Sequence, residues 1–226
     1  DKKSATEIVS EAWNQGIQEF DTAQGYGESE TVLGDAFSEI GIANDVLVVS
    51  KFDPKLDPLD RTAMQAALDG SLKKLRIPKL YGILLHHEEL FTLWEKGLNN
   101  ILQICVSSGK TQHIGISVYS PVIAIRALNT EGIDLIQVPS NILDRRFEQA
   151  GVFQLAQKLN KQVYIRSAFL QGLILISPQK IPKKMAFVQP VLERLHKLSK
   201  KIEMSCQEIA LGYLKIGMPN AQIVVG

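Results

Sequence analysis

The sequence predicts an α/β protein in which repeated strand–helix units surround a parallel sheet. Short β-branched runs alternate with longer helical patterns along the whole chain, as expected for βα repeats. Several strand runs are apolar nearly throughout, which is typical of strands covered on both faces. The chain has 226 residues, and α/β barrels span roughly 200–250 residues as one domain. We therefore expect a single (β/α)8 barrel (TIM barrel) domain over residues 1–226.

Seven runs of the sequence are predicted to form strands. In chain order they are Ile17–Phe20, Val46–Ser50, Tyr81–Leu85, His113–Ile116, Leu135–Ile136, Val163–Arg166 and Ile223–Val225. A closed barrel of this kind needs eight strands, and a helical pattern from Ser4 precedes the first run. We expect that the first strand of the barrel and the segment after Gly226 are missing from this chain.

Capping residues mark where the helices begin. The pairs with capping-box spacing are Ser4 with Glu7 and Ser205 with Glu208. The pairs that place an N-cap residue before a proline are Asp57-Pro58 and Ser120-Pro121. Between the second and third strand runs, residues 63–75 carry apolar side chains at helical spacing, which predicts a helix packed on the sheet.

The composition excludes several classes of protein. A formal net charge of +1 gives no electrostatic reason to expect binding to nucleic acid or to an anionic membrane. No apolar run approaches the roughly 20 residues that span a bilayer. The two cysteines, Cys105 and Cys206, lack the spacing of a disulfide framework or a metal site. Two reduced cysteines are typical of a cytoplasmic protein, so we expect that location. The sequence does not set the oligomeric state.

Polar residues follow six of the strand runs. They are Asp21, Lys51, His86, Ser117, Gln137 and Ser167. A polar group at one strand end is usually just solvated. In a barrel, however, the carboxyl ends of the strands gather into one ring, where the active sites of such enzymes lie. Together these six residues predict a functional site.

Three of these residues could act together with Tyr26 in one reaction. A tyrosine has an ordinary pKa of about 10, so it is a poor acid at neutral pH unless its anion is stabilised. A nearby lysine, here Lys51, favours the ionised form, and Asp21 can orient that lysine. A histidine such as His86 can polarise a carbonyl group. The set is suited to protonating an oxyanion as hydride reaches a carbonyl carbon.

The segment Phe20–Gly34 reads Phe-Asp-Thr-Ala-Gln-Gly-Tyr-Gly-Glu-Ser-Glu-Thr-Val-Leu-Gly. It resembles the signature Asp-Thr-Ala-x-x-Tyr-Gly-x-Ser-Glu-x-x-Leu-Gly of the aldo-keto reductases. The resemblance implies reduction of an aldehyde or ketone by a nicotinamide cofactor, with a small-molecule carbonyl compound as substrate. It also implies a catalytic tetrad of Asp21, Tyr26, Lys51 and His86. Tyr26 would be the proton donor.

The histidine of the tetrad has a neighbour of the same type, His87. Side chains alternate across a strand, so we expect only one of the two to face the barrel mouth. The family pattern at the end of the strand favours His86. His87 would then lie at the rim.

The resemblance extends to the cofactor. Residues 109–117, Gly-Lys-Thr-Gln-His-Ile-Gly-Ile-Ser, are similar to a family motif whose serine binds the nicotinamide carboxamide, although Val118 replaces the usual asparagine. The implied cofactor-binding residues are Asp21, Ser117, Gln137, Arg166, Ser167, Phe169, Gln171 and Gly172. Arg166 stands where the family often stacks an aromatic ring on the nicotinamide. A dinucleotide-binding Gly-x-Gly-x-x-Gly loop is missing. NADPH is the expected cofactor, and NADH remains open.

A different class of function stays possible on the same residues. Barrels host many functions, so a regulatory or scaffold protein that binds the cofactor with little turnover is the alternative. The complete tetrad favours the enzyme.

Overall fold

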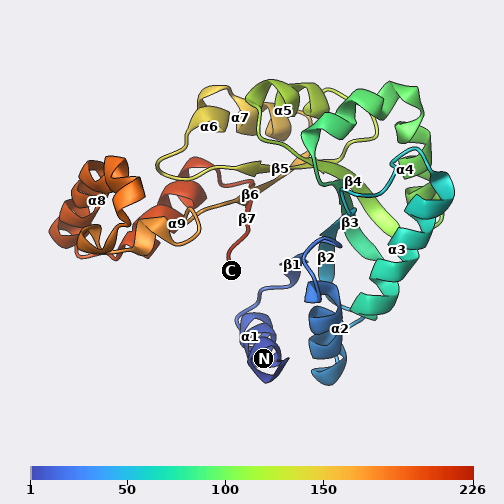
Figure 1. Cartoon of the computed structure of the whole chain (residues 1–226), viewed down its shortest axis with the longest axis horizontal. Coiled ribbons are helices and arrows are strands. Elements are labelled where there is room, and N and C mark those ends of the chain that lie inside the picture. Colours follow the sequence, from blue (N-terminus) through green and yellow to red (C-terminus); the bar gives the residue numbers. More distant parts are fainter. Residues whose placement is uncertain (1) are drawn as a thin grey trace. The chain divides into compact units, whose positions relative to one another are not determined.

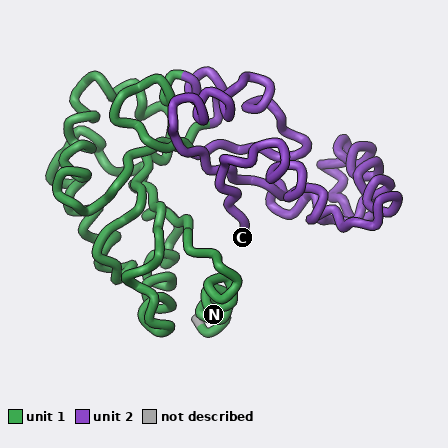
Figure 2. Tube along the Cα trace, turned by 180° about the vertical axis from the view of Figure 1, so that it is seen from behind, with its two compact units in different colours: residues 1–118, 126–136 green, residues 119–125, 137–226 purple. Residues whose placement is uncertain are grey.

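The computed structural model describes residues 2–226, and it consists of strands that alternate with helices (Figure 1). The chain forms two compact units, which Figure 2 shows in different colours. Unit 1 comprises residues 1–118 and 126–136, and unit 2 comprises residues 119–125 and 137–226. Each unit is described by itself below.

Unit 1 begins with a helix and then repeats strand and helix. Its elements are α1 (Lys2–Asn14), β1 (Glu19–Asp21), α2 (Ser29–Glu39), β2 (Leu47–Lys51), α3 (Arg61–Leu75), β3 (Leu80–Leu85), the 3₁₀ helix η1 (Glu88–Lys96), α4 (Leu98–Ser107) and β4 (Thr111–Ser117). Neighbouring strands are parallel, with Phe20 opposite Val48, Ser50 opposite Ile83 and Leu84 opposite Gly115. The carboxyl ends of β1 to β4 therefore lie at one edge.

Two glycines allow close packing within unit 1. A Cβ atom on Gly34 of α2 would lie 2.1 Å from the Lys74 carbonyl oxygen of α3. A Cβ atom on Gly115 would lie 2.5 Å from the Leu135 carbonyl oxygen. Real Cβ atoms do not approach backbone atoms so closely, so only glycine lets these segments pack at this distance.

The elements α5 (Pro121–Leu128) and β5 (Leu135–Pro139) run from one unit into the other. Unit 2 continues with α6 (Arg146–Gln149), α7 (Val152–Lys158), β6 (Gln162–Arg166), η2 (Leu173–Leu175), η3 (Pro178–Lys180), η4 (Lys183–Val188), α8 (Gln189–Ile202), α9 (Cys206–Gly217) and β7 (Gln222–Ile223). Strand β6 pairs in parallel with β7. The strands β1 to β7 follow one another in chain order.

All seven expected strands are present, with ends that shift by up to three residues. The expected helix over residues 63–75 is α3, and Pro121 is the first residue of α5. The capping box of Ser205 and Glu208 at the start of α9 is confirmed.

Two predicted helix starts are wrong. Helix α1 already includes Lys2, so Ser4 lies inside the helix and does not cap it. Helix α3 begins after Asp60, whose side chain accepts a hydrogen bond from the Ala63 amide. Asp57 instead accepts a hydrogen bond from the amide of Leu59, two residues on. Both aspartates can cap a backbone amide, and local sequence does not tell which one begins the helix.

Among the helices of residues 2–226, none combines the length and the apolar character needed to cross a bilayer.

Candidate active site

A buried ion pair joins the ends of β1 and β2. Asp21 is the last residue of β1 and Lys51 the last of β2. The Lys51 ammonium lies 2.8 and 2.7 Å from the two Asp21 carboxylate oxygens and donates a 2.8 Å hydrogen bond to the Thr22 carbonyl oxygen. The Lys51 side chain is 1% exposed. Burying an ammonium group costs free energy unless the group is paired and hydrogen-bonded. The carboxylate of Asp21 and the carbonyl oxygen of Thr22 offset this desolvation cost for Lys51.

Tyr26 lies beside the ammonium group. The Lys51 Nζ atom is 5.2 Å from the centroid of the Tyr26 ring, a cation–π distance. The ring of His86 meets the same tyrosine edge-to-face at 5.7 Å between centroids. Tyr26 is 49% exposed, so its phenol lies between a buried cation and solvent. Asp21, Tyr26, Lys51 and His86 are thus gathered in one place within unit 1.

The side chains of the consecutive residues His86 and His87 are in contact. Strand β3 ends at Leu85, so both residues follow the strand and its alternation of side chains does not govern them. The rings of His86 and His87 stack with centroids 5.2 Å apart and planes 17° apart. His86 is the one that meets Tyr26, whereas His87 is exposed. This geometry supports His86 as the histidine of the tetrad.

A second polar network lies behind the ion pair. Glu30 of α2 is 1% exposed, and its Oε1 atom accepts a 2.8 Å hydrogen bond from the Ser50 hydroxyl. Its Oε2 atom lies 3.8 Å from the Lys74 ammonium of α3. Nearby, the Thr22 hydroxyl donates a 2.9 Å hydrogen bond to the Ser29 hydroxyl. These contacts of Ser29 and Glu30 were not predicted from the sequence, although both residues are part of the Phe20–Gly34 signature.

In unit 1, two of the expected cofactor-binding residues end strands. Asp21 ends β1, and Ser117 ends β4 and is buried. Val118, which replaces the asparagine expected from the resemblance, is completely buried.

Gln137 does not end its strand. Strand β5 continues to Pro139, so Gln137 is its central residue and is buried. The expected end after Ile136 was wrong because a buried strand can contain a polar residue. An apolar run is therefore not a reliable guide to strand length.

Arg166 and Ser167 follow one another at the end of β6. The guanidinium carbon of Arg166 lies 4.2 Å from the centroid of the Tyr119 ring. Its Nη1 atom donates a long hydrogen bond of 3.5 Å to the Ser167 hydroxyl. Its Nη2 atom is buried and has no hydrogen-bond partner among residues 2–226. A buried donor without a partner is costly, so this atom fits a polar group supplied by a ligand.

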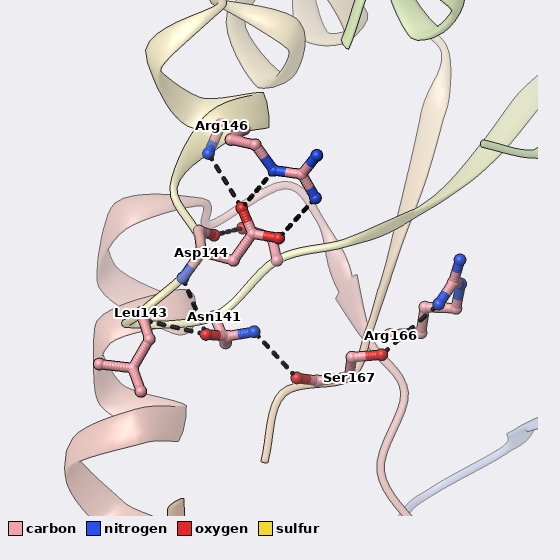
Figure 3. Close-up of polar contacts among 7 residues, drawn as sticks. Asn141, Leu143, Asp144, Arg146, Arg166 and Ser167 are labelled. Carbon is pink, nitrogen blue, oxygen red and sulfur yellow. Dashed lines mark hydrogen bonds and ion pairs between the residues drawn. The ribbon is translucent and has the colours of Figure 1, made fainter. Parts of the chain in front are cut away.

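A polar cluster holds Ser167 from the other side (Figure 3). The Asn141 side-chain amide donates a 3.2 Å hydrogen bond to the Ser167 carbonyl oxygen, and its oxygen accepts hydrogen bonds from the Leu143 and Asp144 amides. Two hydrogen bonds from the Arg146 guanidinium hold the pKa of the Asp144 carboxyl below its ordinary value. The cluster therefore fixes the loop after β5 against the start of the loop after β6.

The loop after β6 has an unusual backbone. Ser167, Leu170 and Gln171 adopt φ angles of 62°, 48° and 54°, and Gly172 follows at 84°. Left-handed conformations cost energy for residues other than glycine, and they cluster at ligand sites. Phe169 packs against the hydrophobic core of unit 2. Two of the expected cofactor-binding residues of this loop, Ser167 and Gln171, thus lie on strained backbone.

Comparison with known proteins assigns the chain to a family. Residues 1–226 match the family model described as Aldo/keto reductase family. The chain belongs to the aldo/keto reductase family. It is 29% identical over 162 residues to the aldo-keto reductase YhdN of Bacillus subtilis (strain 168), a match that covers 66% of this chain and 47% of that protein. The chain spans about half the length of the curated relatives it matches.

Solved structures show the same fold. An aldo-keto reductase from Bacillus halodurans in its holo form is 22% identical, with a TM-score of 0.81 over 99% of this chain and 76% of that chain. An aldo-keto reductase from Klebsiella pneumoniae in complex with NADPH is 20% identical, with a TM-score of 0.78 over 99% and 74% of the two chains. The likeness confirms the predicted α/β barrel fold class.

Proposed function

We propose that this aldo/keto reductase family member transfers a hydride from a nicotinamide cofactor to an aldehyde or ketone. The observation that carries the proposal is the buried Lys51–Asp21 ion pair beside Tyr26 and His86. A cation held against a phenol, next to an imidazole, provides a proton donor and a group that orients a carbonyl. We treat residues 1–226 as one barrel domain that contains this site.

Each residue of the tetrad has one role. Asp21 and the Thr22 carbonyl oxygen hold Lys51 in place and keep it charged. Tyr26 gives its phenolic proton to the carbonyl oxygen of the substrate. Lys51 stabilises the phenolate that remains, because opposite charge favours the ionised form. His86 orients the carbonyl oxygen toward Tyr26.

The cofactor, when bound, supplies the hydride that forms the new bond at the carbonyl carbon. The oxygen takes the proton of Tyr26, so the product is an alcohol. We propose NADPH as the donor, since a family member from Klebsiella pneumoniae was solved with it; NADH remains the alternative. Asp21, Ser117, Gln137, Arg166, Ser167, Phe169, Gln171 and Gly172 would hold the cofactor. The buried Nη2 atom of Arg166 supports this assignment.

The substrate is then a small carbonyl compound, and nucleic acid is not expected as a partner. We place the activity in the cytoplasm. The support for that location is that Cys105 and Cys206 are free thiols, because reduced cysteines are typical of the cytoplasm.

The substitution Tyr26→Phe tests the proton donor. We expect it to lower kcat by about 10²–10⁴-fold, the usual contribution of general acid catalysis, while NADPH binding followed by fluorescence stays nearly unchanged. Tyr81→Phe is the matched control, since Tyr81 lies near the start of β3, at the opposite end of the strand from His86, and its ring packs on His113. Unchanged turnover in Tyr26→Phe would contradict the assignment. NADPH binding by the wild-type protein without turnover on any carbonyl compound would favour the regulatory or scaffold alternative.

A further inference from the structure

Gln24 lies in the loop between Asp21 and Tyr26, and its side chain makes three hydrogen bonds. The Nε2 atom donates to the Ala67 carbonyl oxygen at 3.1 Å and to the Ser71 hydroxyl at 2.9 Å. The Oε1 atom accepts a hydrogen bond from the Asp53 amide at 2.8 Å. Both ends of the side-chain amide are therefore in use.

These partners belong to two segments distant in sequence. Ala67 and Ser71 lie on consecutive turns of α3, and Ser71 is 1% exposed. Asp53 lies two residues beyond Lys51, after the end of β2. The Gln24 backbone amide also donates to the Lys51 carbonyl oxygen at 3.0 Å. Gln24 thus ties the tyrosine loop to α3 and to the segment that follows the catalytic lysine.

The loop needs such an anchor because Tyr26 stands between two glycines. Gly25 and Gly27 precede and follow it, and Gly27 has a φ of 58°. Glycine permits more backbone conformations than any other residue. Tyr26 itself is half exposed, and its backbone bonds within the loop: its amide donates to the Ala23 carbonyl oxygen at 3.0 Å, and its carbonyl oxygen accepts from the Ser29 amide at 3.1 Å. Contacts that tie this loop to the rest of unit 1 therefore contribute to where the phenol lies.

We propose that Gln24 is a positioning residue for Tyr26, acting through the loop and without touching the reacting atoms. Its side-chain amide holds the loop in the position in which the Tyr26 ring contacts Lys51 and His86. The inference rests on the proposed function, in which Tyr26 is the proton donor. A misplacement of about 1 Å in a catalytic group costs on the order of 100-fold in rate.

The substitution Gln24→Met tests this role, because methionine keeps the length of the side chain and removes its hydrogen bonds. We expect kcat in NADPH-dependent reduction of benzaldehyde to fall about 10–100-fold, and the Kd of NADPH to change less than about twofold. Gln103→Met is the matched control: Gln103 donates its side-chain amide to the Gly132 carbonyl oxygen, away from the tetrad. Its kcat should stay at the wild-type value.

The partner in α3 gives a second test. Ser71→Ala removes one hydrogen bond of Gln24 from outside the site. We expect Ser71→Ala to lower kcat less than Gln24→Met does. In the double variant, the fold-loss of kcat should be smaller than the product of the two single fold-losses, because both substitutions remove the same contact. Losses that simply multiply would overturn the inference. A kcat for Gln24→Met equal to that of the wild type would overturn it too, while leaving the proposed function intact.

A measurement that does not depend on turnover distinguishes the positioning role of Gln24 from the proposed function. With ¹³C-labelled tyrosine, the ring signal of Tyr26, assigned by its loss in Tyr26→Phe, should move in Gln24→Met and stay in place in Gln103→Met. A signal that stays in place in both variants contradicts the positioning role. If the wild-type protein reduces no carbonyl compound, the proposed function fails, and this measurement still decides whether Gln24 positions Tyr26.

Discussion

Glu30 accepts a hydrogen bond from the Ser50 hydroxyl at 2.8 Å, so the residue just before Lys51 is tied to helix α2. Ser50 and Lys51 are neighbours in β2, and their side chains point to opposite faces of the sheet. Lys51 faces Asp21 and Tyr26, whereas Ser50 faces helix α2. Glu30 therefore links strand β2 to helix α2, and Lys74 extends the link to α3.

Loss of Glu30 should destabilise the fold. Glu30→Ala leaves the buried Ser50 hydroxyl without its acceptor and opens a small cavity, so we expect the free energy of unfolding to fall by about 2–3 kcal/mol. Urea unfolding followed by circular dichroism measures this change. Glu28→Ala is the control, because Glu28 is exposed and its side chain makes no capping hydrogen bond. Equal stability of the two variants would contradict the role of Glu30.

Variants of the Lys51–Asp21 pair should separate its contribution to stability from its contribution to activity. Asp21→Asn leaves a buried ammonium group without its counter-charge, so we expect a loss of about 3 kcal/mol in unfolding free energy together with a loss of turnover. Adding Lys51→Met to this variant removes the buried charge. The double variant should regain stability, measured by urea unfolding, but not turnover. Continued loss of stability in the double variant would show that the charge is not the cause.

Acid should weaken the Asn141–Asp144 cluster of unit 2. Hydrogen bonds from the Arg146 guanidinium depress the pKa of Asp144 in the folded state. In the unfolded chain an aspartate titrates near about 3.9. The stabilisation is thus complete above that pH and is lost as the pH falls through the lower, folded-state pKa, because there the unfolded state binds more protons.

The substitution Asp144→Asn tests this pH dependence. The Arg146 side chain is largely exposed, so we expect a loss of about 1 kcal/mol or less at pH 7. The difference in unfolding free energy between variant and wild type should shrink below about pH 4. Asp57→Asn serves as the control for a carboxylate in an exposed turn. A difference that stays constant from pH 7 to pH 3 would contradict the assigned cause.

Much of the fold follows from local patterns. Alternating β-branched and helical runs predicted all seven strands, because strands buried on both faces need continuous apolar sequence. Helix starts were less predictable. Ser205 caps α9 as expected, whereas Asp60 rather than Asp57 begins α3. Several polar residues near a helix start can cap it, and packing of the helix decides among them.

The sequence by itself predicted which residues form the candidate site, from the strand ends and from the signature in Phe20–Gly34. Asp21, Tyr26, Lys51 and His86 are recognisable because each lies at or near a strand end, and parallel strands bring their carboxyl ends to one edge. Only the tertiary structure decided how these residues are held. Gln24 meets Ser71 and Asp53, and Glu30 meets Ser50, across 20 to 47 residues of sequence. Periodicity reports neighbours within a few positions, so such contacts appear only when the folded chain brings α2 next to β2 and the Gln24 loop next to α3.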